Sequence, residues 1–507
     1  MNLSKHTISR IGTAKADMPL PGYFELPEKV LQFGTGVLLR GLPDYFIDKA
    51  NKKGIFNGRV VVVKSTSAGD ADAFEKQEGL YTLCVRGIDN GREVEENILN
   101  ASISRVLSAK NDWKKVLECA KNPDLEIVIS NTTEVGISLQ ADDDIRANPP
   151  ESFPGKLLAF LFERYKAFNG AKDKGLVIIP TELIPDNGTK LESIIEELAH
   201  LNKLDYAFMD WLENCNHFCN SLVDRIVPGK LPVQKQQQVE AQLGYKDELM
   251  IMSEVYRLWA IEGDKDIAEK LSFAKADEGV IIADNIDKYR ELKLRLLNGS
   301  HTFTCGLAFL AGFHTVKEAM ADERFSTFIT KLMYDEIIPA ITGELISQSE
   351  AKDFAAKVLD RYRNPNIDHQ WLSITMQYSS KMRMRCLPIL EKFYQAYKAV
   401  PQNMALGIAA YILFMRTQKD ATGKFWGKVE SRNYIVVDDK AAFCYDKWNQ
   451  VQGDQLVHEI LKSKEHWGTD MTAFPGFEKA VAGYLKQLEQ NGAAAVLSKT
   501  ASMAIAV

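Results

Sequence analysis

Short apolar runs alternate with amphipathic segments through the first half of the chain. Residues 30–33 form one such run, followed by a glycine turn at 34–36 and an amphipathic stretch to about residue 51. A second run, at 60–63, consists of four valines. β-Branched residues in a row favour a strand that is buried on both faces, as in a parallel sheet. The order strand, glycine turn, helix, strand predicts the start of an α/β domain.

The pattern continues with a hairpin and two helix–strand pairs. Residues 80–87 alternate like a strand, and Asp89-Asn90-Gly91 is typical of a tight hairpin turn. A helix at 109–121 precedes a strand at 126–130, and a helix at 155–168 precedes a strand at 176–180. We therefore predict a parallel sheet with an inserted hairpin.

The patterning changes near residue 285, where the strand signals nearly vanish. We predict an α/β plus all-α organisation, with an N-terminal domain at 1–285 and a mostly helical domain at 286–507. The segments beyond 285 with helical periodicity or composition are 288–320, 323–341, 350–362, 380–398 and 403–416.

Charge and composition exclude several classes of protein. The net charge of -6 provides no basic excess for nucleic acid. No run approaches the roughly 18 apolar residues of a membrane helix, and the N-terminus lacks an apolar signal region. Seven cysteines, an odd and sparse set, disfavour a disulfide framework. The spacing of Cys215 and Cys219 matches no common zinc site, so we expect no metal. The sparse cysteines and the lack of a signal region predict a reduced, cytoplasmic protein.

Gly34 and Gly36, directly after the first strand, indicate a dinucleotide-binding turn. The first glycine permits a tight bend, and the second lets the backbone approach a pyrophosphate. The N-terminus of the next helix attracts the negative charge. Arg40 follows and could reach a phosphate. A glycine pair alone also fits a plain turn, but its place between strand and helix predicts a Rossmann-type domain.

The end of the second strand leaves the type of cofactor open. An acidic residue there would hold the ribose hydroxyls of NAD, but Lys64 occupies the position. A lysine could instead accept the phosphate of NADP.

The most informative segment for catalysis runs from Lys293 to His301. In an α-helix, at about 100° per residue, Lys293, His301 and Asn298 lie at roughly 0°, 80° and 140° and share one side. Reduction of a carbonyl by hydride needs a proton donor and groups that stabilise an alkoxide. Gly299 would let another element approach the helix closely. Spacing alone favours an exposed lysine, a capping asparagine and a core histidine.

These segments together resemble the mannitol dehydrogenase family of polyol-specific long-chain dehydrogenases. K-x-x-x-x-N-x-x-H at 293–301 is similar to the family signature, and F-G-x-G-x-x-x-R at 33–40 is similar to its cofactor turn. Thr132-Thr133-Glu134 resembles the stretch beside the nicotinamide. Further similar blocks, which extend the resemblance over nearly the whole chain, are Q-E-G-L-Y-T at 77–82, F-P-G-K-L at 153–157, V-D-R-I-V-P at 223–228 and R-Y-R-N-P at 361–365.

The resemblance implies roles for single residues. Lys293 would be the general acid/base, Asn298 an oxyanion donor and His301 a substrate-positioning group, with Asp224 and Lys381 as substrate contacts. The partner would be a small sugar acid, and the enzyme a monomer or small homo-oligomer. The implied cofactor is NAD, without a metal, and the residues expected to bind it are Phe33, Gly34, Thr35, Gly36, Arg40, Lys64, Thr132, Thr133 and Glu134.

One departure from the family pattern bears on the substrate. Leu183 stands where mannitol dehydrogenases carry an asparagine that also stabilises the oxyanion, and E-L-I-x-x-N-G at 182–188 resembles members that act on keto-uronates. We expect reduction of D-tagaturonate to D-altronate, with fructuronate or a neutral polyol as alternative substrates. A non-catalytic cofactor-binding protein is the alternative of a different class. A uronate needs a cation for its carboxylate, and the candidates are Arg290, Arg361, Arg363 and Lys381.

Overall fold

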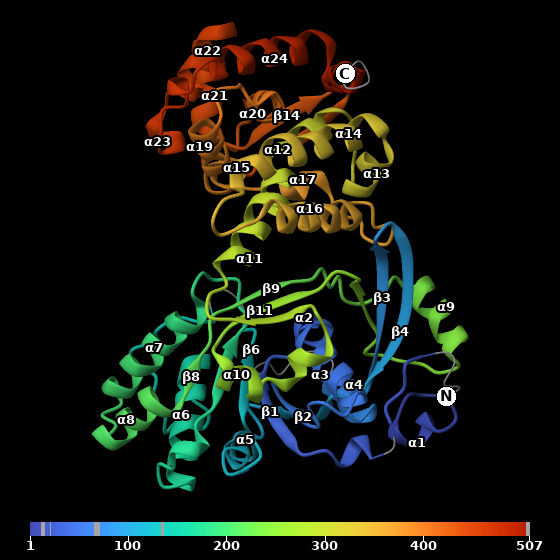
Figure 1. Cartoon of the computed structure of the whole chain (residues 1–507), viewed down its shortest axis with the longest axis vertical. Coiled ribbons are helices and arrows are strands. Elements are labelled where there is room, and N and C mark those ends of the chain that lie inside the picture. Colours follow the sequence, from blue (N-terminus) through green and yellow to red (C-terminus); the bar gives the residue numbers. More distant parts are fainter. Residues whose placement is uncertain (12–15, 21, 65–70, 133–135, 503–507) are drawn as a thin grey trace. The chain divides into compact units, whose positions relative to one another are not determined.

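The computed structural model describes residues 1–11, 16–20, 22–64, 71–132 and 136–502. The chain forms two compact units, coloured along the sequence in Figure 1. The first comprises Met1–Gly87 and Glu93–Asp287, and the second comprises Ile88–Arg92 and Lys288–Val507. No helix among the described residues is both long and apolar enough to cross a membrane.

A six-stranded sheet forms the centre of the first unit (Figure 1). Its order is β5-β2-β1-β6-β7-β8, and all neighbours are parallel. This is the order of a doubly wound dinucleotide-binding sheet, so the predicted Rossmann-type domain is confirmed. The strands are β1 (Glu28–Phe33), β2 (Arg59–Lys64), β5 (Ile103–Ser108), β6 (Ile127–Ser130), β7 (Val177–Pro180) and β8 (His217–Phe218).

Successive residues of the central strands pack into cores on opposite faces of this sheet. Val30 and Val60 join one core together with Phe46 of α3 (Pro43–Lys52). Leu31 and Val61 join the other. Every residue of β2 is buried, as the four valines predict. The helices on the second face are α5 (Trp113–Cys119), α6 (Phe153–Ala167), α7 (Asn187–Leu201) and α8 (Tyr206–Cys215).

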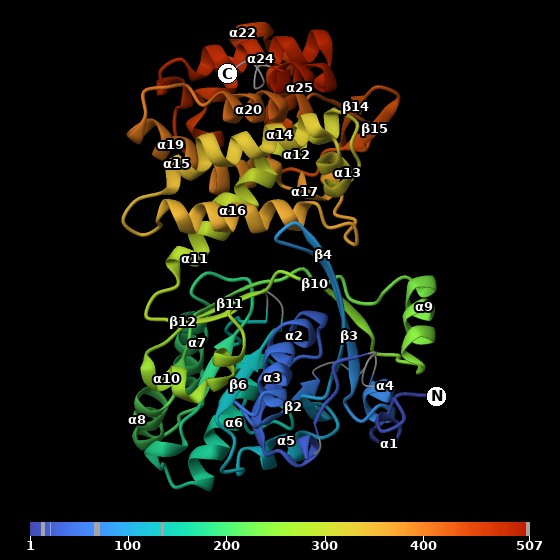
Figure 2. The ribbon, with the colours of Figure 1, turned by 45° about the vertical axis from the view of Figure 1, so that its right-hand side comes forward.

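The predicted hairpin is present between β2 and β5. β3 (Tyr81–Asp89) and β4 (Arg92–Asn100) are neighbours in a sheet with β10 (Ile251–Glu254), and they form a long ribbon in Figures 1 and 2. The φ angles of Asn90 and Gly91 at its turn are 51° and 73°. A tight type I′ hairpin turn requires positive φ at both positions. A further small sheet consists of β9 (Ser221–Asp224), β11 (Leu258–Glu262) and β12 (Val280–Ala283).

The helix predicted to follow the glycine turn without a break is divided. α2 (Val37–Gly41) and α3 are separated by Leu42, whose φ is -134° and ψ is -76°. Pro43 begins α3, and a proline disfavours helical backbone at the residue before it. The prediction of one helix to Asn51 was therefore wrong.

Helices make up most of the second unit, as predicted. α20 packs against both α12 and α24. A three-stranded antiparallel sheet of β13 (Thr417–Lys419), β14 (Phe425–Val429) and β15 (Arg432–Ile435) was not predicted. The helices include α12 (Ser300–Leu310), α13 (Val316–Ala321), α14 (Glu323–Lys331), α15 (Ile338–Ile341), α16 (Gln348–Tyr362), α17 (Trp371–Ile374), α18 (Tyr378–Lys381), α19 (Leu387–Ala396), α20 (Gln402–Phe414), α21 (Ala441–Gln450), α22 (Gly453–Leu461), α24 (Phe477–Asn491) and α25 (Ala493–Ser502).

Three predicted long helices of this unit contain a π-helical stretch. η4 (Lys293–Gly299) joins α11 (Asp287–Leu292) to α12, and η5 (Leu332–Ile337) joins α14 to α15. η6 (Met382–Cys386) joins α18 to α19. π-Turns are rare and frequently occur at functional sites. η4 carries two of the predicted catalytic residues, and η6 directly follows Lys381.

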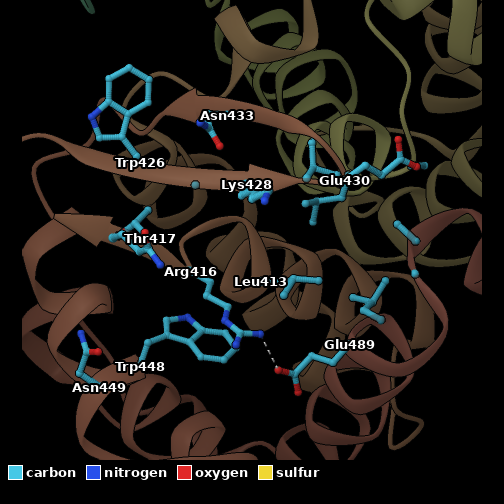
Figure 3. A pocket seen from close by; sticks show the side chains of 18 of the residues that line it. Leu413, Arg416, Thr417, Trp426, Lys428, Glu430, Asn433, Trp448, Asn449 and Glu489 are labelled. Atoms are coloured by element: carbon cyan, nitrogen blue, oxygen red, sulfur yellow. Dashed lines mark hydrogen bonds and ion pairs between the residues drawn. The ribbon is translucent and has the colours of Figure 1, made fainter. Parts of the chain in front are cut away.

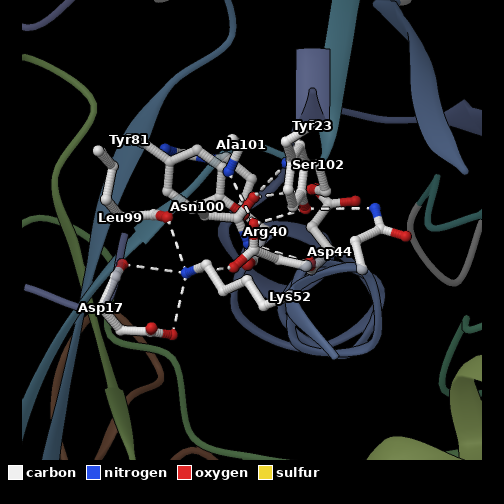
Figure 4. A network of polar contacts seen from close by, with 12 residues as sticks. Asp17, Tyr23, Arg40, Asp44, Lys52, Tyr81, Leu99, Asn100, Ala101 and Ser102 are labelled. Carbon is white, nitrogen blue, oxygen red and sulfur yellow. Dashed lines mark hydrogen bonds and ion pairs between the residues drawn. The ribbon is translucent and has the colours of Figure 1, made fainter. Parts of the chain in front are cut away.

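A buried polar network links α2 and α3 to the hairpin (Figure 4). The Tyr81 hydroxyl donates to the Arg40 carbonyl at 2.7 Å, and Asn100 Nδ2 donates to the Asp44 carbonyl at 3.0 Å. The Asp44 carboxyl is fully buried and accepts a hydrogen bond from Gln32 Nε2 at 3.3 Å. Burial raises the pKa of Asp44 to about 7. Asp44 is therefore protonated in acid and charged in alkali within the folded protein.

Asp44→Asn is expected to flatten the pH dependence of stability. The folded-state pKa exceeds the ordinary 3.8, so the stabilisation is complete below about pH 4 and is lost as pH rises through about 7. Since one pKa unit corresponds to about 1.4 kcal/mol, the loss reaches at most about 4 kcal/mol. Urea unfolding of wild type and variant at about pH 5 and about pH 8 measures it. The same pH dependence in both proteins would contradict this role.

Candidate active site

Gly34 lies where the strand order reverses between β1 and β6, the position at which doubly wound sheets bind cofactors. Its φ is 125°, a value that favours glycine, and its N–H donates to the Val63 carbonyl at 3.0 Å. A Cβ at Gly34 would lie 2.9 Å from the Asn131 carbonyl oxygen. Only glycine fits at this end of β1.

Gly36 shows a different requirement. It is exposed, precedes α2 as its N-cap and has φ -59°. A Cβ at Gly36 would meet no atom of the described residues within 4 Å. Thr35 beside it is half-buried. The backbone at Gly36 is thus open to a ligand, which is what close approach of a pyrophosphate needs.

Three other predicted cofactor residues are buried. Phe33 is 4% exposed and packs edge-on against Phe153, with ring centroids 5.2 Å apart. Lys64, the last residue of β2, is 5% exposed. Arg40 is 3% exposed, its Nη1 donates to the Leu249 carbonyl at 2.8 Å, and its guanidinium lies over two aromatic rings. The expected phosphate contact of Arg40 is not supported, because tertiary packing buries its charged group.

The catalytic lysine and asparagine predicted from the sequence lie on η4. A π-helical hydrogen bond joins residues i and i+5. The five-residue spacing therefore places Asn298 about one turn after Lys293, whereas the expected α-helical winding separates them by roughly 140°. That winding was wrong. Both residues are half-buried, and the Asn298 amide makes no hydrogen bond within the part of the chain that the structure describes.

His301 follows in the first turn of α12 and is 7% exposed. Its ring stacks on Tyr362 at 4.1 Å and contacts His369 and Trp371 edge-on at 5.3 and 5.9 Å. Burial lowers the pKa of His301 well below its ordinary value, so the imidazole is neutral. Its Nε2 is buried and has no hydrogen-bond partner among the described residues. His369 was not among the predicted site residues and is part of this cluster.

Basic side chains influence the electrostatics of His301. After burial, the positive charges of Arg361, Arg385 and Lys381 lower the pKa of His301, as would a charge on His369, whose own pKa burial also lowers. Arg361 and Lys381 belong to the predicted set, and Arg385 was missed. Arg385 follows the exposed Arg383 by two residues, and nothing in the sequence distinguished it from such a surface arginine.

The remaining predicted substrate residues lie elsewhere. The Arg363 side chain is 41% exposed and pairs with Asp360 at 3.7 Å. It is a surface residue and not part of the cluster around His301. Asp224 ends β9 in the first unit, is 6% exposed and lies opposite Leu258 of β11.

Two family models match most of the chain. They are the mannitol dehydrogenase Rossmann domain at residues 28–275 and the mannitol dehydrogenase C-terminal domain at residues 285–489. Altronate oxidoreductase of Bacillus subtilis (strain 168) is 38% identical over 474 residues, 93% of this chain and 94% of the relative. Altronate oxidoreductase of Shigella flexneri is 37% identical over 478 residues, 92% and 96% of the two chains. The chain belongs to the mannitol dehydrogenase family.

Solved structures of similar fold include Pseudomonas fluorescens mannitol 2-dehydrogenase in a ternary complex with NAD and D-mannitol. It is 23% identical, with a TM-score of 0.69 over 99% of both chains. D-Sorbitol dehydrogenase in substrate-free form is 19% identical, with a TM-score of 0.76 over 98% of this chain and 100% of the other. The mannitol dehydrogenase fold therefore extends through the whole chain.

In this member of the mannitol dehydrogenase family, Glu182 organises the ends of β6 and β7. Glu182 is 3% exposed, and burial raises the pKa of its carboxyl. Its Oε1 accepts hydrogen bonds from the N–H and hydroxyl of Thr132, at 2.8 and 3.0 Å. Thr133 and Glu134 lie outside the described residues. Leu183, the departure from the family pattern, is 59% exposed and carries no polar group.

The mannitol dehydrogenase C-terminal domain also contains a cavity of about 1240 Å³ beside the β13–β15 sheet (Figure 3). Arg416 lies over the Trp448 ring at 4.9 Å and pairs with Glu489 at 3.3 Å. None of the predicted site residues lines this cavity.

Metal ligands do not gather in the part of the chain that the structure describes, where no group of three or more His, Cys, Asp or Glu could hold an ion. Cys215 ends α8 and Cys219 follows β8, and both are buried.

Proposed function

We propose that the chain catalyses the reaction D-tagaturonate + NADH + H⁺ ⇌ D-altronate + NAD⁺. Relatives that carry the name altronate oxidoreductase are 37–38% identical over more than nine-tenths of this chain. The observation that carries the proposal is that Lys293 and Asn298 lie one turn of π-helix apart and that a buried, neutral His301 follows at the start of α12, with basic side chains acting on it.

NAD binding is assigned to a domain at residues 1–285. The glycine turn fits this cofactor, since Gly34 permits the tight bend and the space beside Gly36 is open. The turn at 33–36 would hold the pyrophosphate, and residues 132–134 would hold the nicotinamide. Lys64, the last residue of β2, would lie beside the ribose. NADH supplies the hydride. The backbone carbonyl of Arg40 accepts a hydrogen bond from the Tyr81 hydroxyl, which holds α2 beside the hairpin.

Proton chemistry is assigned to the domain at 286–507. The Lys293 ammonium donates a proton to the ketone oxygen as the carbonyl carbon is reduced, and takes it back in the reverse direction. The Asn298 amide donates a hydrogen bond to the developing alkoxide. The neutral His301 ring orients a substrate hydroxyl through Nε2. Asp224, Arg361 and Lys381 are the proposed further contacts of substrate.

The state of the cysteines and the net charge support the proposed location and partners of the enzyme. All seven cysteines are free thiols, which fits a reducing cytoplasm. A small sugar acid is the partner, nucleic acid is disfavoured by the charge of -6, and the enzyme acts as a monomer or small homo-oligomer.

The wild-type enzyme is expected to prefer D-tagaturonate over the neutral ketose fructose by roughly one to two orders of magnitude in kcat/KM. A cation left without its carboxylate in a partly buried site costs about 1–3 kcal/mol, and about 1.4 kcal/mol is tenfold. Initial rates of NADH oxidation with tagaturonate, fructuronate and fructose, repeated with NADPH, measure the preference.

Each outcome of this comparison selects one function. Equal kcat/KM for fructose and tagaturonate would replace the uronate assignment with a general polyol dehydrogenase. Faster turnover of fructuronate would move the substrate to that isomer. Absence of NADH oxidation with all three sugars would favour a non-catalytic cofactor-binding protein.

A further inference from the structure

The backbone of η6 is held against η4. Arg295 Nη1 donates to the carbonyls of Met384 and Arg385, at 2.8 and 3.1 Å. A Cβ at Gly299 would lie 2.9 Å from Ile389 Cδ1, so the close approach expected at this glycine is confirmed. These contacts fix the backbone of Arg385 relative to the turn that carries Lys293 and Asn298.

The Arg385 side chain lies beside the start of α12. Its Nη1 is 3.5 Å from Thr302 Oγ1, and that hydroxyl donates to the Asn298 carbonyl at 2.7 Å. Arg385 thus contacts the residue after His301, over the segment between Asn298 and His301. A guanidinium has five N–H donors, and this long contact uses only one of them.

The charge of Arg385 is not balanced by a protein acid. Arg385 is partly buried, and burial lowers the pKa of its guanidinium. No acidic side chain pairs with Arg385 among the described residues. The neighbouring Arg295 is different, because Glu291 accepts two hydrogen bonds from it at 3.1 Å. A partly desolvated cation without a partner is costly, and an anionic ligand removes that cost.

We propose that Arg385 is the residue that binds the carboxylate of the substrate, through two parallel hydrogen bonds. The inference rests on the proposed function, because it requires a sugar acid. The planar guanidinium matches a carboxylate in geometry and charge. The orphan Nε2 of His301 lies in the same cluster and remains for a hydroxyl of the same molecule.

Lys381 and Arg363 are less suited to this role. The Lys381 ammonium already donates to the Ile374 carbonyl at 2.9 Å. A lysine is also a point charge and cannot form the paired contact. Arg363 is exposed and paired with Asp360. Lys381 and Arg361 add positive potential around the carboxylate.

Arg385→Met tests the proposal through a change of specificity. The kcat/KM for D-tagaturonate should fall about 10- to 100-fold, mainly through KM, while that for fructose changes less than about threefold. Arg385→Lys should give an intermediate value, because lysine keeps the positive charge but cannot form the two parallel hydrogen bonds. Calorimetric titration with D-altronate and with the neutral polyol altritol, in the presence of NAD⁺, gives a second measure that does not need turnover.

Arg383→Met is the matched control. Arg383 is an exposed residue of the same π-helical stretch, and its guanidinium lies beside Gly468. This variant should keep wild-type preference. A wild-type enzyme without preference for tagaturonate would defeat the proposed function itself. A wild-type preference that survives in both folded Arg385 variants would overturn the role of Arg385 alone. Arg385→Lys serves as the test if Arg385→Met does not fold.

Discussion

Lys293→Ala is expected to lower kcat with D-tagaturonate by about 10²–10⁴-fold, the range that a positioned proton donor contributes. Lys293 opens η4, and Asn298 lies one π-turn after it. Without the Lys293 ammonium, the Asn298 amide can still donate a hydrogen bond, but no acid remains to protonate the ketone oxygen. NADH affinity should stay unchanged, because the glycine turn belongs to the other compact unit.

The measurements are steady-state rates at saturating substrate, NADH titration and a pH profile of kcat/KM. The profile of the variant should lose the limb that reports the proton donor. Lys288→Ala is the control, since Lys288 lies five residues earlier and pairs with Glu350 at 2.7 Å. Wild-type kcat in Lys293→Ala would exclude this lysine as the acid. An equal loss in Lys288→Ala would trace the effect to charge or folding.

Patterning predicted the sheet well because its central strands are buried on both faces, with successive residues in opposite cores. The valines of β2 alternate between two cores. A short run that is apolar at every position is typical of a strand that is buried on both faces. The small β13–β15 sheet was missed because its strands have three to five residues and are partly exposed. Such short runs carry little periodic signal.

The candidate site was predictable only as far as residue types and local order go. The motif identified the residues of the 293–301 segment. It did not predict that part of the segment is a π-helix, because an inserted π-turn leaves the apolar pattern almost unchanged. The surroundings of two arginines, Arg40 and Arg385, were not predictable from the sequence. Arg40 was assigned to a ligand and is buried under aromatic rings, whereas Arg385 was passed over and lies near His301. The difference depends on tertiary packing, which a single sequence does not reveal.

Gly36→Val is expected to weaken NADH binding by about 10- to 100-fold while the protein remains folded. Among the described residues no atom lies within 4 Å of a Cβ added at Gly36, and the φ of -59° suits any residue. The valine would nevertheless occupy the space in which a pyrophosphate approaches the backbone before α2. Loss of one or two charge-assisted N–H bonds to phosphate accounts for the expected weakening.

Gly34→Val separates this effect from damage to the fold. At Gly34 the φ of 125° and the Asn131 carbonyl oxygen, 2.9 Å from an added Cβ, both oppose a side chain. That variant should unfold at a clearly lower temperature than wild type, whereas Gly36→Val should stay close to it. NADH titration by protein fluorescence and thermal unfolding of both variants test the difference. Unchanged NADH affinity in a folded Gly36→Val protein would remove the glycine turn from the cofactor site, because no described residue opposes a side chain there.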